Sequence, residues 1–233
     1  STGFVNNRKV HWERTLTKST GRCTLASAKE ITAITNEYQK RIIEGDTTVV
    51  LPLVAYYGTG RLWLQHREKK EDVLLNSSRT NGYIDCMDSA ANDKLIMNWL
   101  NKETSKKLQK KTGTAAFDAV IMAIEKCISL LIESNDVTVS YNFDNNDLDI
   151  QYKKDDQEVI LPLNRMSDGY KCTISLITDI AYRMAQLNPQ LREKVLDAPG
   201  VVIIDEIDLH LHPEWQKRIL GDLTSIVISI SLK

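Results

Sequence analysis

One stretch of sequence decides the fold: Val201-Val202-Ile203-Ile204-Asp205-Glu206-Ile207-Asp208-Leu209-His210-Leu211-His212-Pro213. It opens with four apolar β-branched residues after Pro199 and Gly200, a pattern that predicts a short, fully buried strand of a parallel sheet. Two carboxylates, Asp205 and Glu206, follow that strand directly. Ligands of open α/β sheets bind just beyond the carboxyl ends of the strands, so the two acids lie where a site is expected.

Neighbouring carboxylates at such a position suit nucleotide hydrolysis. The first, Asp205, would hold a Mg²⁺ ion directly or through water, and the second, Glu206, would polarise the attacking water. The alternative is a strand end with two solvated acids, because an Asp-Glu pair after an apolar run is common. The pair alone does not decide between these interpretations.

A second motif lies upstream, in the serine-glycine segment formed by Ser167, Asp168, Gly169 and Tyr170. It leads into an apolar-periodic helix that is predicted from Cys172 to about Leu187. A serine hydroxyl, a glycine that permits close backbone approach and the exposed amides of a helix N-terminus together form an anion-binding surface. Taken alone, this pattern is more often a helix cap and a turn.

Together the two motifs resemble the signature motif and the Walker B and D-loop segments of ABC-type ATPase heads. The closer likeness is to the SMC-, RecF- and OLD-like group of bacterial AAA-type ATPases, and the stretch from Leu51 to Trp63 adds a third likeness. The resemblance covers most of residues 50–226. It implies an α/β fold: a P-loop NTPase-like core with a mostly parallel sheet, an added antiparallel β-meander and a helical insertion.

The resemblance also implies a mechanism and its partners. It assigns Asp205 to binding Mg²⁺ and Glu206 to polarising the attacking water. It assigns Ser167 and Gly169, with Asp168 beside them, to contacts with the γ-phosphate of ATP bound to a second subunit. Asp208 is assigned to the D-loop that signals across the dimer. The implied cofactors are ATP and Mg²⁺, and the implied partners are a second copy bound through the nucleotide site, an effector such as a nuclease, and DNA or RNA. The implied setting is bacterial anti-phage defence or genome maintenance.

The family pattern is incomplete in this chain. A P-loop needs G-x-x-x-x-G-K-[ST], and the sequence contains no Gly-Lys pair. The resemblance places that loop upstream of Ser1 and a switch histidine downstream of Lys233, so we expect an ATPase head that is incomplete at both ends. The expected parts are a partial ATPase core at 1–64, a helical or lid insertion at 65–113, and an ATPase lobe with the meander and motifs at 114–233.

Composition sets broader bounds. With 26% charged residues and a net charge of -1, the chain has no overall attraction to nucleic acid or to a membrane surface. The four cysteines, Cys23, Cys86, Cys127 and Cys172, form no C-x-x-C pair, which favours reduced thiols. No run approaches the ~18 apolar residues of a membrane span. These features predict a cytoplasmic protein.

Local patterns predict the remaining elements. Strands around a polar turn are expected in 4–16. A further strand is expected at 47–56, and a glycine turn follows it. Arg61 ends this turn, where its side chain could reach a phosphate or simply lie on the surface. Lysines 102, 106, 107, 110 and 111 form a basic cluster that suits phosphate contacts or, more often, a solvated helix face. Helical periodicity predicts helices at 25–44, with Ser27 as N-cap, at 92–100, at 114–133 and from Pro213 to about 223. Strands are expected at 137–143, 148–152, 158–163 and 226–232.

Two other functions remain open at this point. The chain could be a non-hydrolysing scaffold that keeps the ATPase fold to bind a partner. It could also be a metal-dependent hydrolase, because His210 and His212 alternate beside Asp205, Glu206 and Asp208 and imidazole and carboxylate groups bind transition metals. Retained partner binding without ATP-linked behaviour would favour the scaffold, and a stoichiometric transition metal would favour the hydrolase.

Overall fold

The structure is a computed structural model of the chain. It describes residues 2–5, 8–11, 13, 15–16, 23–24, 28–59, 78–88, 93–110, 114–154, 157–209, 211–227 and 230–232. These residues fall into two compact units, 1–49 and 50–233.

The first unit contains short strands and one helix. Strands β1 (Thr2–Val5) and β2 (Arg8–His11) form the antiparallel pair that the alternation in 4–16 predicts, and β3 (Thr15–Leu16) pairs with β4 (Cys23–Thr24). Helix α1 (Lys29–Ile43) is shorter than predicted: its N-cap is Ala28, which makes no side-chain capping bond, and Ser27 lies outside the described residues. The chain turns at Gly45, whose φ of 84° suits glycine.

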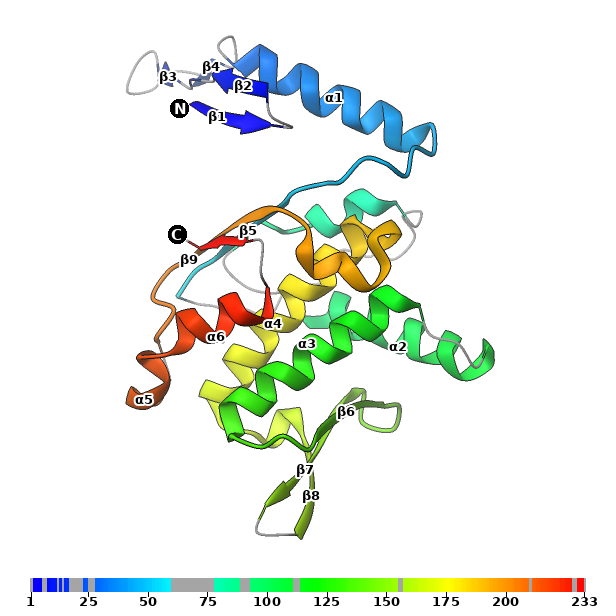
Figure 1. The fold of residues 1–233 in the computed structure, drawn as a ribbon, viewed down its shortest axis with the longest axis vertical. Coiled ribbons are helices and arrows are strands. Elements are labelled where there is room, and N and C mark those ends of the chain that lie inside the picture. The colour runs from blue at the N-terminus through cyan, green and yellow to red at the C-terminus, as the bar shows by residue number, and fades with distance from the viewer. Residues whose placement is uncertain are drawn as a thin grey trace. The chain divides into compact units, whose positions relative to one another are not determined.

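The second unit contains a three-stranded parallel sheet that lies along one side of it (Figure 1). Strand β9 (Gly200–Ile204) lies between β5 (Leu53–Tyr57) and β10 (Ile230–Leu232). In the register, Leu53 pairs with Gly200 and Tyr57 with Ile204. The carboxyl ends of β5 and β9 therefore meet at one edge of the sheet.

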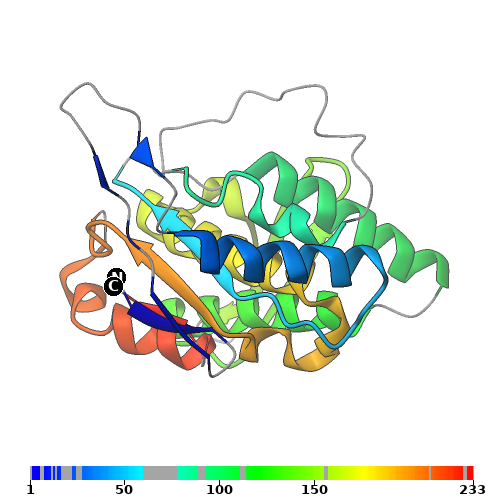
Figure 2. The same ribbon diagram turned by 90° about the horizontal axis from the view of Figure 1, so that it is seen from above.

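The prediction that β9 is fully buried is wrong. Val202 is fully buried, whereas Val201 and Ile203 are 42% and 40% exposed, and Val54 on β5 is 40% exposed. The reason is that α3 (Ala115–Ile132), α4 (Asp168–Leu187) and α6 (Ile219–Ile226) lie on one side of this sheet (Figures 1 and 2). Side chains alternate across a strand, so only every second residue faces the helices.

The helices differ from the predicted ranges at their ends. Helix α2 (Asp93–Lys110) is longer than predicted and carries four of the clustered lysines, while Lys111 lies outside the described residues. Thr114 caps α3 by accepting a bond of 3.3 Å from the amide of Phe117. The single helix expected after Pro213 is two helices, α5 (Pro213–Gln216) and α6.

An antiparallel meander connects α3 to α4. Strands β6 (Val137–Asn142), β7 (Asp147–Lys154) and β8 (Gln157–Pro162) pair in chain order, which confirms the predicted hairpins. The meander continues through the 3₁₀ turn η3 (Leu163–Arg165) into the serine-glycine segment. The whole is a mixed α/β structure with a parallel and an antiparallel sheet in its second unit.

Two further features agree with the composition. Cys86, Cys127 and Cys172 are free thiols, and burial raises the pKa of the Cys127 thiol to about 12. None of the helices within the described ranges combines the length and the apolar character that crossing a bilayer requires.

Candidate functional site

The acid pair lies at the carboxyl edge of the parallel sheet. The amide of Asp205 donates to the carbonyl of Tyr57 over 2.8 Å, which extends the β5–β9 pairing by one residue. Residues 205–209 form the turn that follows, and we refer to them as the acidic turn. The side chains of Asp205, Glu206 and Asp208 are all exposed. The carboxylates are therefore held by a fixed backbone and face solvent.

A tyrosine of the neighbouring strand holds the first carboxylate. The hydroxyl of Tyr56 donates to Oδ2 of Asp205 over 2.7 Å. This bond, followed by burial and by the charge of Asp205, raises the pKa of the Tyr56 phenol. Tyr56 thus stays protonated at neutral pH and orients the carboxylate of Asp205 through Oδ2.

Glu206 has a backbone conformation that is uncommon for its type. Its φ is 47°, in the left-handed region where a Cβ atom is crowded and glycine is favoured. The carbonyl of Glu206 accepts a bond from the amide of Leu209 over 2.9 Å, which closes the acidic turn. A strained conformation of this kind is kept only where the surrounding structure holds it in place, and such residues cluster at functional sites.

Side chains of α5 fix the end of the acidic turn. Nε2 of Gln216 donates to the carbonyls of Asp208 and Leu211, each over 3.2 Å. The Nδ1 atom of His212 accepts from the amide of Glu214 over 3.5 Å and so caps α5. His210 lies outside the described residues. Within the described ranges no three metal-ligating side chains gather into a cluster.

The serine-glycine segment begins helix α4. Ser167 is the N-cap of this helix, but its side chain makes no capping bond, and the residue is exposed. Gly169 is buried, and its carbonyl accepts from the hydroxyl of Thr173 over 3.0 Å. The sequence-based helix prediction started four residues late, because the cap residues are polar and carry no apolar periodicity.

The structure brings the serine-glycine segment against α5. The rings of Tyr170 and Trp215 meet edge to face with centroids 4.5 Å apart. Around this contact lies a pocket of about 480 Å³, which is lined by Ser167, Gly169, Tyr170, Leu211, His212 and Trp215. Asp205 and Glu206 do not line this pocket, and Arg61 lies outside the described residues.

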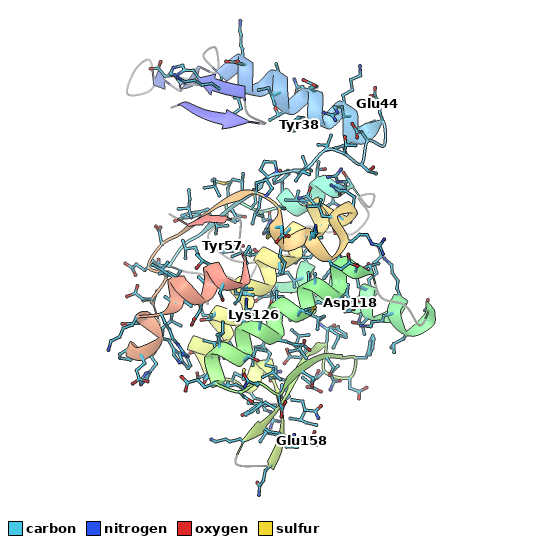
Figure 3. The ribbon with its side chains drawn as sticks, in the orientation of Figure 1. Tyr38, Glu44, Tyr57, Asp118, Lys126 and Glu158 are labelled. Carbon is cyan, nitrogen blue, oxygen red and sulfur yellow. The ribbon has the colours of Figure 1, made fainter. Side chains whose placement is uncertain are left out.

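A buried polar network joins α4 to the strand next to the acid pair. The carboxylate of Asp179 accepts from the hydroxyl of Tyr57 over 2.6 Å and from Nε of Arg183 over 2.8 Å. Arg183 also donates to the carbonyls of Gly82 and Ile84 over 3.0 and 2.6 Å. Tyr57 lies between the sheet and the helices (Figure 3). The helix that begins at Ser167 and the strand whose end holds Asp205 are therefore fixed to each other.

Sequence reasoning missed these supporting residues. The hydrogen bond between Tyr56 and Asp205 depends on the register of β5 and β9. It joins residues 149 positions apart, so no local sequence pattern indicates it. The Asp179–Arg183 pair did leave a signal, because two opposite charges four residues apart interrupt a predicted apolar helix, and charged residues are buried when they are paired.

A parallel sheet with acids at its carboxyl edge, beside a helix that begins with a serine-glycine segment, is the arrangement of nucleotide-binding α/β proteins. Comparison with known families agrees. Residues 25–231 match the family described as the AAA ATPase domain, and the chain belongs to this family.

Shorter stretches resemble characterised bacterial proteins. One is 48% identical over 69 residues to a "Retron Ec83 probable ATPase" of Escherichia coli, covering 30% of this chain and 12% of that protein. Another is 53% identical over 58 residues to a "Retron Vc95 probable ATPase" of Vibrio cholerae, covering 25% and 11%. A third is 46% identical over 61 residues to a "Septu protein PtuA" of Bacillus mycoides, covering 26% and 8%. The matches thus span only about a tenth of each relative's length.

Proposed function

We propose that the chain forms the catalytic part of an ABC-type ATPase head that binds and hydrolyses ATP. The observation that carries this proposal is the placement of Asp205 and Glu206 on a fixed backbone at the carboxyl edge of the parallel sheet. Membership of the AAA ATPase domain family supports it. In this proposal Glu206 orients and polarises the attacking water, and Asp205 contacts the metal.

The residues present fit Mg²⁺ better than a transition metal. The acidic turn supplies carboxylate oxygens, and the described residues hold no cluster of three ligands. Mg²⁺ keeps several waters and is bound through one or two carboxylates together with substrate phosphates. When bound, it would neutralise charge on the phosphates. Asp205, oriented by Tyr56, would hold it, and Glu206 would act on water.

We also propose that a second copy completes the site. Ser167 is exposed and its side chain makes no capping bond, so it can contact a phosphate, with Asp168, Gly169 and the N-terminal amides of α4 beside it. The pocket of the serine-glycine segment excludes the acid pair of the same chain. The two halves of the site would therefore meet across a head-to-tail dimer, with Asp208 at the boundary and Arg61 as a further phosphate contact.

The names of the relatives support a proposal for the biological role. Proteins named as retron ATPases and as a Septu protein share about a quarter of this chain. We propose that the ATPase drives a bacterial anti-phage defence complex together with an effector such as a nuclease, and that DNA or RNA is a further ligand. This proposal requires a P-loop, and the sequence contains no Gly-Lys pair that could belong to one.

A mixing experiment tests the shared site. Two variants, Ser167→Arg and Glu206→Gln, are made in the longer protein that carries the upstream P-loop, and the release of phosphate from MgATP is measured for each alone and for an equimolar mixture. Each variant alone should be inactive. In the mixture, a site can combine the intact Glu206 of one chain with the intact Ser167 of the other, so activity should return.

The matched control is a mixture of Glu206→Gln with Asp205→Ala. Both substitutions affect the same half of the site, so this mixture should stay inactive. Activity in the Ser167→Arg variant alone, or an inactive first mixture whose chains still associate, would contradict the shared site. Failure of the unmodified longer protein to bind ATP would contradict the ATPase itself and favour a scaffold.

A further inference from the structure

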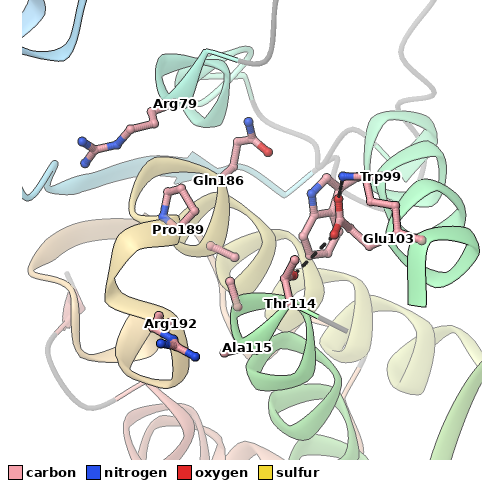
Figure 4. A pocket seen from close by; sticks show the side chains of 11 residues that line it. Arg79, Trp99, Glu103, Thr114, Ala115, Gln186, Pro189 and Arg192 are labelled. Atoms are coloured by element: carbon pink, nitrogen blue, oxygen red, sulfur yellow. Dashed lines mark hydrogen bonds and ion pairs between the residues drawn. The ribbon is translucent and has the colours of Figure 1, made fainter. Parts of the chain in front are cut away.

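A second pocket lies away from the acid pair, between α2, α3 and the end of α4. It measures about 480 Å³ (Figure 4). Its polar walls are formed by Arg79, Glu103, Lys106, Gln186 and Arg192, and the alanines 115, 116 and 185 lie between them. Small-molecule sites commonly have volumes of about 300–1,000 Å³, so the pocket can hold a ligand of nucleotide size.

Positive charge dominates this second pocket. Three cationic side chains and one carboxylate line it. The carboxylate, Glu103, is satisfied by Lys106 at 2.5 Å and by the hydroxyl of Thr114 at 3.4 Å. Arg79 is oriented by bonds from Nε to the carbonyl of Leu187 and from an Nη atom to Asn188. The walls therefore favour an anion, and their guanidinium groups suit phosphate.

Arg192 occupies a backbone position that suits glycine. Its φ and ψ are 56° and -119°, the combination of the first central residue of a type II′ turn, where glycine is strongly preferred. The residue forms the kink within the 3₁₀ segment η4 (Pro189–Asp197). Its side chain is exposed and makes no ion pair or hydrogen bond with any part of the chain that the structure describes. A strained arginine beside a pocket indicates a functional use of its guanidinium.

An aromatic side chain faces the cations across the pocket. Trp99 is half-buried and lies on the opposite side from Arg79 and Arg192 (Figure 4). Edge contacts hold its ring in place, with centroids 5.9 Å from Phe117 and 5.3 Å from Tyr182. A rigid indole presents a surface on which a nucleobase can stack.

We propose that this pocket is a second binding site, for a small nucleotide whose phosphate contacts Arg192 and whose base packs against Trp99. The site is separate from the acid pair, and it does not depend on the proposed ATPase activity. Arg79 adds a second guanidinium to the pocket wall opposite Trp99, and the alanines leave room for the sugar. The site suits a ligand that reports nucleotide levels to the protein.

The indole N–H signals of the four tryptophans provide a direct test by ¹H–¹⁵N NMR, with AMP as the probe. A Trp99→Phe spectrum assigns the Trp99 signal, and Phe preserves the aromatic contacts. The Trp99 signal should shift saturably with AMP. Ribose 5-phosphate, which lacks the base, should bind more weakly. The Trp215 signal reports separately on the pocket of the serine-glycine segment.

The decisive variant is Arg192→Gly, which removes the guanidinium and relieves the backbone. It should weaken AMP binding about tenfold to a hundredfold, the loss typical of a hydrogen bond to a charged group, without lowering the thermal midpoint. Lys194→Ala removes a neighbouring exposed cation that does not line the pocket and should bind AMP as the unmodified chain does. An unmoved Trp99 signal at millimolar AMP, or equal affinity of Arg192→Gly, would overturn the proposal.

Discussion

Helix α4 carries two ion pairs of equal length in opposite surroundings. Asp179 and Arg183 are joined over 2.8 Å with side chains 1% and 2% exposed, whereas Asp168 and Lys171 are joined over 2.8 Å with side chains 59% and 34% exposed. The two ion pairs therefore differ in the burial of their side chains and not in their N–O distance. The interior pair fixes the helix to β5, and the pair at the N-terminus leaves the serine-glycine segment accessible to a ligand.

The interior of the helix is protected from titration. Burial and the charge of Asp179 raise the pKa of the Tyr57 phenol well above its usual value. Burial alone would lower the pKa of the Arg183 guanidinium, but the charges of Asp179 and Tyr57 and the hydrogen bond to Asp179 together raise it. The Tyr57 phenol and the Arg183 guanidinium therefore each keep one charge state across physiological pH.

The largest expected effect comes from breaking the interior pair. Arg183→Met leaves the carboxylate of Asp179 buried without its cation, which should lower the free energy of unfolding by about 3–5 kcal/mol. Lys171→Met breaks the exposed pair on the same helix and should cost about 0–1 kcal/mol. Urea unfolding of the two variants measures both. Equal losses would show that burial does not distinguish the pairs.

The close contact of the two parallel strands gives the next effect. A Cβ atom on Gly200 would lie 2.7 Å from Cβ of Leu53 and 2.8 Å from its carbonyl oxygen. Gly200→Ala should therefore destabilise the chain by about 1–3 kcal/mol. Gly221→Ala on α6 meets nothing within 4 Å and should stabilise by about 0.5–1 kcal/mol. Thermal unfolding distinguishes the two; stabilisation by Gly200→Ala would refute the close strand contact.

Relieving the strained backbone at Glu206 should change the free energy of unfolding by a smaller amount and should stabilise the chain. Glu206 and Glu133 both have positive φ, 47° and 56°, and Glu133 is the C-cap of α3, where its exposed carboxylate pairs with Arg218 over 3.2 Å. Replacing either with glycine should stabilise the chain by about 1 kcal/mol, but only Glu206→Gly should abolish ATP hydrolysis. Chemical unfolding combined with a phosphate-release assay measures both effects. Loss of activity in Glu133→Gly would show that the strain itself, and not the carboxylate, matters.

The smallest effect concerns a half-buried carboxylate in the first unit. Hydrogen bonds from the side chain and amide of Thr48, and then Arg41, lower the pKa of Asp46 from 3.8 to about 2. A lowered pKa means that the stabilisation is present above pH 3.8 and is lost as the pH falls through about 2. Thr48→Ala should move the pKa of Asp46 up toward 3.8, which a ¹³C carboxyl NMR titration detects. An unchanged pKa would contradict the Thr48 bonds.

Much of the second unit could be predicted from sequence because its signals are local. The acid pair follows an apolar run, the meander alternates around Asn and Asp turns, and Thr114 precedes an apolar helix. The exposed face of β9 could not be predicted in this way. Four β-branched residues look alike in sequence, and only the placement of the helices on one side of the sheet distinguishes Val202 from Val201.

The break between α5 and α6 shows a second limit. Pro213 marks the helix start as expected, but the helix ends at Gln216, and Arg218 donates to the carbonyl of Leu130 over 2.6 Å. That bond joins residues 88 positions apart. No propensity within 213–223 indicates it, so a tertiary contact determined the local structure. The Tyr56–Asp205 bond was missed for the same reason.

The most direct test of the central claim is the turnover of MgATP by the longer protein that carries the upstream P-loop, compared with its Glu206→Gln variant. The account predicts that Glu206→Gln retains ATP binding and loses turnover by about 10²–10⁴-fold, the usual contribution of a positioned general base. Turnover of Glu206→Gln at the unmodified rate would contradict the account, because Glu206 would then not act on the attacking water.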